Sequence, residues 1–224
     1  MRALKASMFV SISAFFRVLF AQCLSNTIDL KACITFSLTA LSVYVLDRSF
    51  DFNSYKEIAI AIAFALAASL IYPCCSYIPP LALFIGFMYS KGIRGLRLKR
   101  GYGIKNIVTA TTWGTIIAFF SKIDVHIIAF FTLKSFIITV LNDIKDLKDD
   151  LEMGIKTIPA ILGNRTLQFL IVVNIILHLI VLTWLPLPCY LLSLLISFYA
   201  IKKINPKLAQ AEFLPQSILL ISTE

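Results

Sequence analysis

The chain of 224 residues is 59% hydrophobic and only 15% charged, with a formal net charge of +9. Soluble domains are about half apolar and about one quarter charged, so this composition excludes an ordinary soluble domain and favours a protein embedded in lipid. The positive charge would suit nucleic-acid binding, but the cations alternate with apolar segments along the chain, which is typical of membrane topology instead.

Apolar runs recur along the whole chain and predict an all-α, polytopic transmembrane helical bundle of about eight helices. Several runs approach the roughly 20 residues that cross the hydrocarbon core of a bilayer. They are continuously apolar, whereas a membrane β-barrel needs short segments of alternating polarity. Because no soluble domain or linker interrupts them, we expect residues 1–224 to form a single membrane domain. The runs lie at about 8–24, 30–46, 57–72, 77–90, 107–121, 125–141, 167–185 and 188–201.

The first run carries Arg17 in its middle. A cleaved signal peptide has an uninterrupted apolar core followed by small residues, so we expect this run to remain as a membrane helix. Most of the 21 lysines and arginines fall in alternate connections between the runs. The positive-inside rule then places the N-terminus and these basic connections on the cytoplasmic side.

The second run ends in the first acidic cluster, Asp47-Arg48-Ser49-Phe50-Asp51. On a helix, Asp47 and Asp51 stand at i and i+4 and share one face. This spacing alone is a weak signal, because a charged helix end that faces water has the same composition. The cluster is therefore a candidate site only in combination with a second one.

The connection between the fourth and fifth runs is strongly basic. It reads KGIRGLRLKRGYGIKN and ends in Lys105 and Asn106. Cations at the mouth of a cavity stabilise a phosphate-bearing substrate, because its negative charge is concentrated. The alternative is plain topology, since the inner loops of most membrane proteins are basic.

The sixth run leads into the second acidic cluster, Asn142 to Asp150, which reads NDIKDLKDD. If the helix continues through the cluster, Asp143, Asp146 and Asp150 fall at i, i+3 and i+7 and share one face. Three crowded carboxylates are stable mainly when a divalent cation lies among them. Mg²⁺ is the natural candidate, because it prefers oxygen ligands and is commonly held by one or two carboxylates and substrate phosphates. The alternative is an exposed segment whose acids balance the neighbouring lysines.

Lys134 lies nine residues before Asp143 in the same run. On a helix this places it about 13 Å deeper in the membrane. An ionisable side chain at that depth faces a cavity or a partner, or else extends along the helix toward the outer surface.

After the eighth run, residues 212–224 hold only a brief apolar stretch at 218–221. We therefore expect a further membrane helix to be absent or truncated. A missing helix would open the bundle sideways to lipid, or a partner chain would supply the wall.

The segment 142–163 resembles the second aspartate motif of the UbiA superfamily of intramembrane prenyltransferases. That motif, DxxDxxxD followed by Gly, a basic residue or Thr, Pro and Gly, matches Asp143, Asp146, Asp150, Gly154, Lys156, Thr157, Pro159 and Gly163. The first motif of the family, NDxxDxxxD, is half present, because Val43 and Tyr44 stand where Asn and Asp are expected before Asp47 and Asp51. The chain thus resembles a divergent branch with a Tyr-x-x-Asp-Arg-x-x-Asp pattern.

The resemblance implies a UbiA-like bundle whose central cavity opens to the inner face. It also implies Mg²⁺-dependent transfer of a prenyl group from a prenyl diphosphate to a lipophilic acceptor, with membrane lipid as surroundings and no nucleic acid. The implied catalytic and metal-binding residues are Asp47, Asp51, Asp143, Asp146 and Asp150. The implied substrate-binding residues are Tyr44, Arg48, Lys105, Asn106, Lys134 and Asn142.

Two alternatives stay open. A terpene cyclase or diphosphate lyase of the same superfamily would need no external acceptor, and the incomplete first motif is compatible with it. A transporter or lipid-binding protein would use its intramembrane charges to mark a substrate path instead of a metal site.

Overall fold

The computed structural model describes residues 2–51, 54–92, 103–152 and 154–223, and within these ranges it contains helices and no strand. The prediction of an all-α fold is confirmed. The eight predicted runs correspond to α1 to α6, α9 and α10. The α-helices are α1 (Arg2–Leu24), α2 (Leu30–Asp51), α3 (Tyr55–Ile71), α4 (Ile78–Ser90), α5 (Ile104–Phe120), α6 (Val125–Lys145), α7 (Leu147–Glu152), α8 (Ile158–Leu162), α9 (Thr166–Ile180), α10 (Leu187–Lys202), α11 (Pro206–Ala211) and α12 (Phe213–Thr223), with 3₁₀ turns η1 (Pro73–Cys75) and η3 (Gly163–Arg165).

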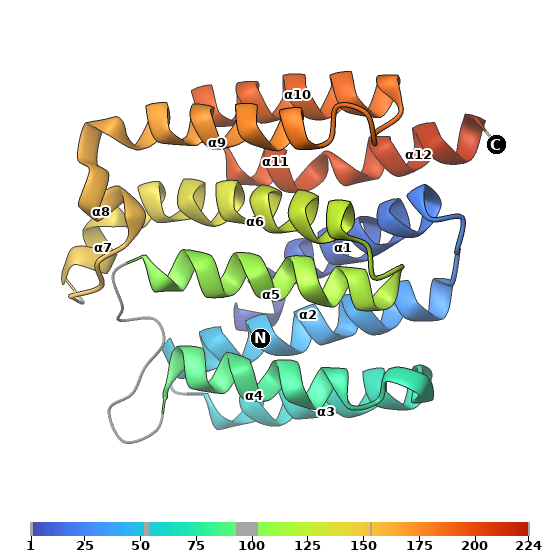
Figure 1. Cartoon of the computed structure of the whole chain (residues 1–224). Helices are drawn as coiled ribbons and strands as arrows, with labels where there is room; N and C mark the ends of the chain where they lie inside the picture. The colour runs from blue at the N-terminus through green and yellow to red at the C-terminus, as the bar shows by residue number, and fades with distance from the viewer. Residues whose placement is uncertain (1, 52–53, 93–102, 153, 224) are drawn as a thin grey trace.

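The long helices run back and forth along one axis and form a bundle (Figure 1). The short helices α7 and α8 lie at one end of it, beside the beginning of α5 (Figure 1). α2 packs against α1, α3 and α4, while α6 packs against α5 and α9. Among the described residues, four helical segments are long and apolar enough to cross a membrane: Ser7–Leu24, Leu30–Phe50, Val125–Lys145 and Ile158–Ile180.

A glycine brings α5 close to α6. A Cβ atom built on Gly114 would lie 2.0 Å from Thr132 Oγ1 and 2.7 Å from the carbonyl oxygen of Ile128. Only a residue without a side chain allows this approach, because the backbone carbonyl of α6 cannot move aside without bending its helix. The close contact fixes how the second half of α5 packs against the first half of α6.

The C-terminal segment forms two short helices, α11 of 6 residues and α12 of 11 residues. Neither is among the described segments that are long and apolar enough to cross a membrane, which agrees with the expectation that a further membrane helix is absent or truncated. The two helices are separated at Glu212, and α12 packs against α1. Pro215 explains the separation, since its ring clashes with the carbonyl of Ala211 four residues earlier and it has no N–H to donate. The short apolar stretch at 218–221 hid this element, because polar residues precede it and the proline interrupts it.

The close approach at Gly114 can be tested against a second glycine, Gly86. A Cβ on Gly86 would lie 2.9 Å from Val43 Cγ1, which is the end of a side chain that can turn away. We expect Gly114→Ala to lower the free energy of unfolding by about 2 kcal/mol, the typical cost of overpacking. Gly86→Ala should change it much less. Thermal unfolding of both variants in one detergent measures the difference, and equal midpoints would contradict this account of the α5–α6 contact.

Candidate active site

A lysine joins two buried carboxylates at one end of the bundle. Lys105 lies in the first turn of α5, and its Nζ is 2.6 Å from Asp143 Oδ1 and 3.1 Å from Asp150 Oδ2. The side chains of Asp143 and Asp150 are only 3% and 4% exposed. Burying a charge is costly unless it is paired, so Lys105 stabilises both carboxylates in this position.

The beginning of α5 is fixed by two further contacts. Asn106 Nδ2 donates a hydrogen bond of 2.7 Å to Asp143 Oδ2. The backbone N–H of Gly103 donates to the carbonyl oxygen of Lys156, 2.9 Å away. Gly103 has φ +65°, a conformation that side-chain-bearing residues rarely adopt, which explains a glycine just before the helix.

The second acidic cluster is not one continuous helix as the sequence predicted. α6 ends at Lys145, Asp146 leaves the helix with φ −96° and ψ 9°, and α7 begins at Leu147. The chain turns here so that the buried Asp150 reaches Lys105. Asp146 is exposed at the turn. The ion pair between Asp150 and Lys105 thus outweighs the local preference for a continuous helix, in which the three aspartates would share one face.

The first acidic cluster lies where α2 meets α4. Ser90 Oγ donates a 2.5 Å hydrogen bond to Asp47 Oδ1. Arg48 is half-buried on the same turn of α2. Asp51 is the last residue of α2, and its side chain lies outside the part of the chain that the structure describes.

A cavity of about 150 Å³ lies between α2, α4 and α5. Its wall is mostly apolar, with two tyrosines and a tryptophan, and it has polar side chains from Asp47 and Ser90. The lining residues are Phe36, Thr39, Ala40, Val43, Tyr44, Asp47, Ala82, Ile85, Gly86, Tyr89, Ser90, Val108, Thr109, Thr112, Trp113 and Ile116. Such a cavity suits a molecule with a long apolar part and a charged end.

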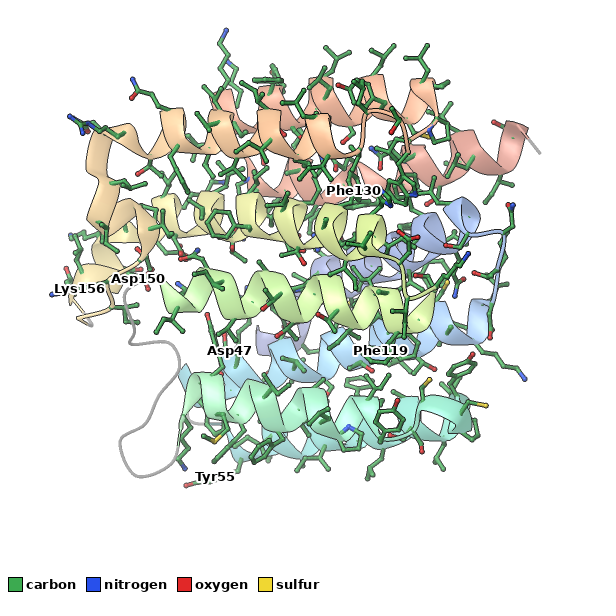
Figure 2. All side chains as sticks on the ribbon, in the orientation of Figure 1. Asp47, Tyr55, Phe119, Phe130, Asp150 and Lys156 are labelled. Carbon is green, nitrogen blue, oxygen red and sulfur yellow. The ribbon has the colours of Figure 1, made fainter. Side chains whose placement is uncertain are left out.

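Tyr89 connects the two acidic clusters. Its side chain lines the cavity, and its hydroxyl group lies within electrostatic range of both Asp47 and Asp143. Figure 2 shows Asp47 and Asp150 toward the same end of the bundle. The structure therefore brings both acidic clusters to one end of the bundle, where Asp47 lines the cavity.

A smaller hollow of about 20 Å³ adjoins the cavity, because Tyr44 and Trp113 line both. Asn142 lines it from α6, together with Arg17 from α1. Lys134 lines neither space. It is buried and paired with Glu212, 2.7 Å away, so its depth is explained by a partner and not by the cavity.

The donor set fits a magnesium ion that substrate helps to hold. Within the described ranges, no group of three or more His, Cys, Asp and Glu side chains is close enough to hold a metal by itself. Two carboxylates do converge, however, because oxygens of Asp143 and Asp150 both lie within 3.1 Å of one ammonium nitrogen. Oxygen ligands in this number suit Mg²⁺, which usually binds one or two carboxylates and completes its shell with phosphate oxygens and water.

Sequence reasoning missed Tyr89 and Ser90. Both lie at the end of the apolar run 77–90, directly before the basic connection. A Tyr-Ser pair at the end of an apolar run, directly before a basic connection, was the available signal. It could not be used without knowing that α4 packs against α2.

Comparisons with known proteins agree with this geometry. The family model described as "UbiA prenyltransferase family" matches residues 57–213. The digeranylgeranylglyceryl phosphate synthase of Methanothrix thermoacetophila is 32% identical over 111 residues, which are 49% of this chain and 41% of that protein. The chain thus matches less than half the length of this curated relative.

A solved structure described as a UbiA homolog from Archaeoglobus fulgidus bound to Cd²⁺ has a similar fold. The TM-score is 0.69 at 16% sequence identity, and the match covers 99% of this chain and 98% of that chain. At this identity the similarity establishes the arrangement of the helices alone. It confirms the predicted UbiA-like fold.

The role of Lys105 as a counter-charge can be tested by stability. Lys105→Met leaves Asp143 and Asp150 buried without their cation, and removing one partner of a buried pair costs about 3 kcal/mol or more. We expect a clearly lower midpoint of thermal unfolding. Lys148→Met, in the exposed part of α7, is the matched control and should change little. An unchanged midpoint for Lys105→Met would show that the two carboxylates do not depend on it.

Proposed function

Because the chain belongs to the UbiA prenyltransferase family, we propose that it transfers a prenyl group from a prenyl diphosphate to a lipophilic acceptor inside the membrane. The observation that supports this most is that Asp47 lines one end of an apolar cavity, while Tyr89 of the same wall lies within electrostatic range of Asp143, which shares Lys105 with Asp150. The charged end suits a diphosphate, and the apolar part suits a prenyl chain. Residues 1–224 act as one unit in this proposal, with the acidic clusters on the cytoplasmic side.

In this function the acidic end binds the diphosphate together with Mg²⁺. The proposed metal-binding and catalytic residues are Asp47, Asp51, Asp143, Asp146 and Asp150. When bound, Mg²⁺ neutralises charge on the diphosphate and so makes it a better leaving group. The chain itself contributes Lys105 and Asn106, whose side chains contact Asp143. Both are also able to donate hydrogen bonds to phosphate oxygens.

The cavity wall orients the prenyl chain. The bond between the first prenyl carbon and the diphosphate oxygen breaks, a bond to the acceptor forms, and the acceptor loses a proton. Positive charge that develops on the prenyl carbon is stabilised by aromatic faces. Tyr44 and Trp113 are two of the aromatic side chains that line the cavity, with ring centroids 6.4 Å apart.

For the acceptor, we propose only its chemical class. The relative that shares 32% identity is named as a synthase of a glyceryl phosphate lipid. This name favours a lipid alcohol over an aromatic ring as the acceptor. We also propose that Tyr44, Arg48 and Asn142 bind substrate. Tyr44 lines both the cavity and the smaller hollow, and Asn142 lines the smaller hollow. Arg48 directly follows Asp47 on α2.

Substitution of the aspartates tests the proposed chemistry. We expect Asp47→Asn and Asp143→Asn each to reduce diphosphate release from a prenyl diphosphate by on the order of 100-fold or more, because charge stabilisation of the leaving group is lost. Asp149→Asn is the matched control, since Asp149 is exposed on α7 and should be dispensable. Thermal unfolding of each variant shows that the fold is kept. Full activity in both site variants would contradict the proposal.

The type of reaction requires a second assay. Purified protein is incubated with Mg²⁺ and a panel of prenyl diphosphates, with and without a native lipid extract, and products are identified by mass spectrometry. We expect a prenylated lipid that forms only with the extract, and chelation of the metal should abolish it. Diphosphate release with a product that needs no extract would indicate a cyclase or lyase. No release under any condition would favour a transporter or lipid-binding protein.

A further inference from the structure

A buried arginine lies in the second half of α1. Arg17 is 3% exposed, and its guanidinium group donates a 3.1 Å hydrogen bond to Ser135 Oγ on α6. The guanidinium carbon lies 4.4 Å from the centroid of the Trp113 ring and 5.1 Å from that of Phe213. Among the described residues Arg17 forms no direct ion pair, and its Nε atom has no hydrogen-bond partner. Because a guanidinium group stays charged, the described residues leave this buried cation without an anion in contact.

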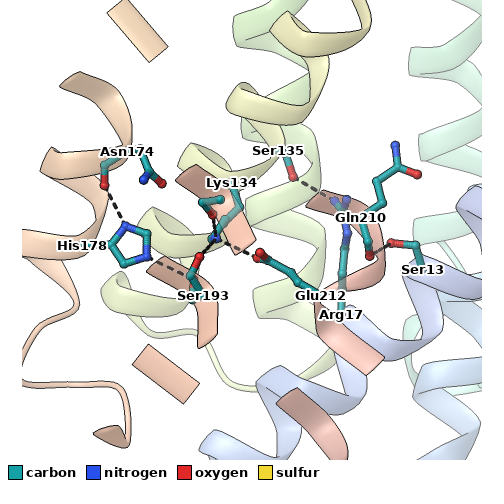
Figure 3. A network of polar contacts seen from close by, with 10 residues as sticks. Ser13, Arg17, Lys134, Ser135, Asn174, His178, Ser193, Gln210 and Glu212 are labelled. Carbon is teal, nitrogen blue, oxygen red and sulfur yellow. Dashed lines mark hydrogen bonds and ion pairs between the residues drawn. The ribbon is translucent and has the colours of Figure 1, made fainter. Parts of the chain in front are cut away.

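The acid that Figure 3 shows in the same region, Glu212, is paired with another cation. Its Oε1 atom lies 2.7 Å from Lys134 Nζ, and the two side chains are 0% and 2% exposed. This pair joins α6 to the bend between α11 and α12. Burying a charge is costly unless it is paired, so an anion from outside the chain would stabilise Arg17 in its place.

The smaller hollow of about 20 Å³ lies beside Arg17. Among its described lining residues Arg17 is the charged one, and the hydrogen-bonding ones are Tyr44, Ser135, Thr139, Asn142 and Gln210. Gln210 is 9% exposed, and its Oε1 atom has no hydrogen-bond partner among the described residues. Ser13 Oγ donates to the backbone carbonyl of Gln210 at 2.9 Å and so ties α11 to α1 at this point (Figure 3). A cation beside amide and hydroxyl groups suits an anionic group.

This hollow is separate from the proposed diphosphate site. Ser135, which accepts the hydrogen bond from Arg17, precedes Asp143 by eight residues on α6, or about 12 Å along the helix. The hollow nevertheless adjoins the cavity, because Tyr44 and Trp113 line both spaces. Prenyl transfer needs a second ligand beside the prenyl diphosphate, and that ligand is the acceptor.

We propose that the hollow binds an anionic group in the head of the acceptor lipid, with Arg17 as its counter-charge and Asn142 and Gln210 as hydrogen-bonding neighbours. A volume of about 20 Å³ holds about one water-sized group, so the hollow takes one end of the head group and not the whole lipid. The assignment to the acceptor rests on the function proposed above. It adds that the acceptor is an acidic lipid, with a phosphate or carboxylate, and not a neutral alcohol.

Ligand binding without turnover tests this site. Trp184→Phe leaves Trp113 as the single tryptophan, beside Arg17. In this background, with a metal chelator and without prenyl diphosphate, the emission of Trp113 is followed during titration with decyl phosphate, decanol or inorganic phosphate. We expect a saturable change with decyl phosphate, and at least about tenfold weaker binding of the other two. Arg17→Gln should raise the Kd for decyl phosphate on the order of tenfold to 100-fold, because a charge-assisted hydrogen bond is lost.

Two glutamines of the C-terminal segment form a matched pair of variants. Gln210 lines the hollow, whereas Gln216 is also buried but lines neither space. We expect Gln210→Leu to raise the Kd for decyl phosphate severalfold and Gln216→Leu to leave it unchanged. This pair decides the question if Arg17→Gln does not fold.

Competition shows which site decyl phosphate occupies. We expect a prenyl thiodiphosphate with Mg²⁺ to leave decyl phosphate bound, and displacement would overturn the proposal because both ligands would then share the diphosphate site. Binding that is equal in the parent, Arg17→Gln and Gln210→Leu would overturn it as well. Equal affinity for decanol or for inorganic phosphate would remove the acidic lipid as the ligand. Failure of the proposed function would be seen separately, as absent diphosphate release from a prenyl diphosphate by the parent protein.

Discussion

The contact of Lys105 with Asp143 and Asp150 is the interaction on which the candidate site depends. It joins the beginning of α5 to the end of α6 and to α7. One ammonium group compensates two carboxylates that are almost fully buried, and Asn106 adds a hydrogen bond to the same aspartate. Because α5 begins at this point, its register, and with it the cavity wall, is set here.

The cavity follows from that register. From Asn106 onward, the residues of α5 that line the cavity are Val108, Thr109, Thr112, Trp113 and Ile116, which recur every three or four positions and so lie on one helical face. The close approach at Gly114 turns the opposite face onto α6. The same helix therefore presents cation and amide to the carboxylates at its beginning and an apolar wall further along. This division matches a substrate with a charged head and a hydrocarbon tail.

Much of this arrangement could be predicted from the sequence. Continuous apolar runs predict the long helices because lipid demands them, and the spacing of Asp143 and Asp150, together with the Lys105-Asn106 pair, indicated residues that the structure brings into contact. The turn at Asp146 could not be predicted, because local spacing favours a continuous helix and only the tertiary contact with Lys105 breaks it. Glu212 was hidden for a similar reason: Pro215 interrupts the apolar pattern, and the partner Lys134 lies far away in the sequence. Lys134 itself was recognised as unusual, but periodicity does not say which side of α6 meets the cavity.

The central claim is that Asp47 on one side and Asp143 and Asp150 on the other hold one diphosphate head group at the end of the cavity. The most direct measurement is an experimental structure of the protein with Mn²⁺ and an unreactive prenyl thiodiphosphate, with the metal located by its anomalous scattering. The account predicts metal density between Asp47 and the Asp143–Asp150 pair, with the prenyl chain along Tyr44 and Trp113. Metal bound elsewhere, or a prenyl chain outside this cavity, would contradict it.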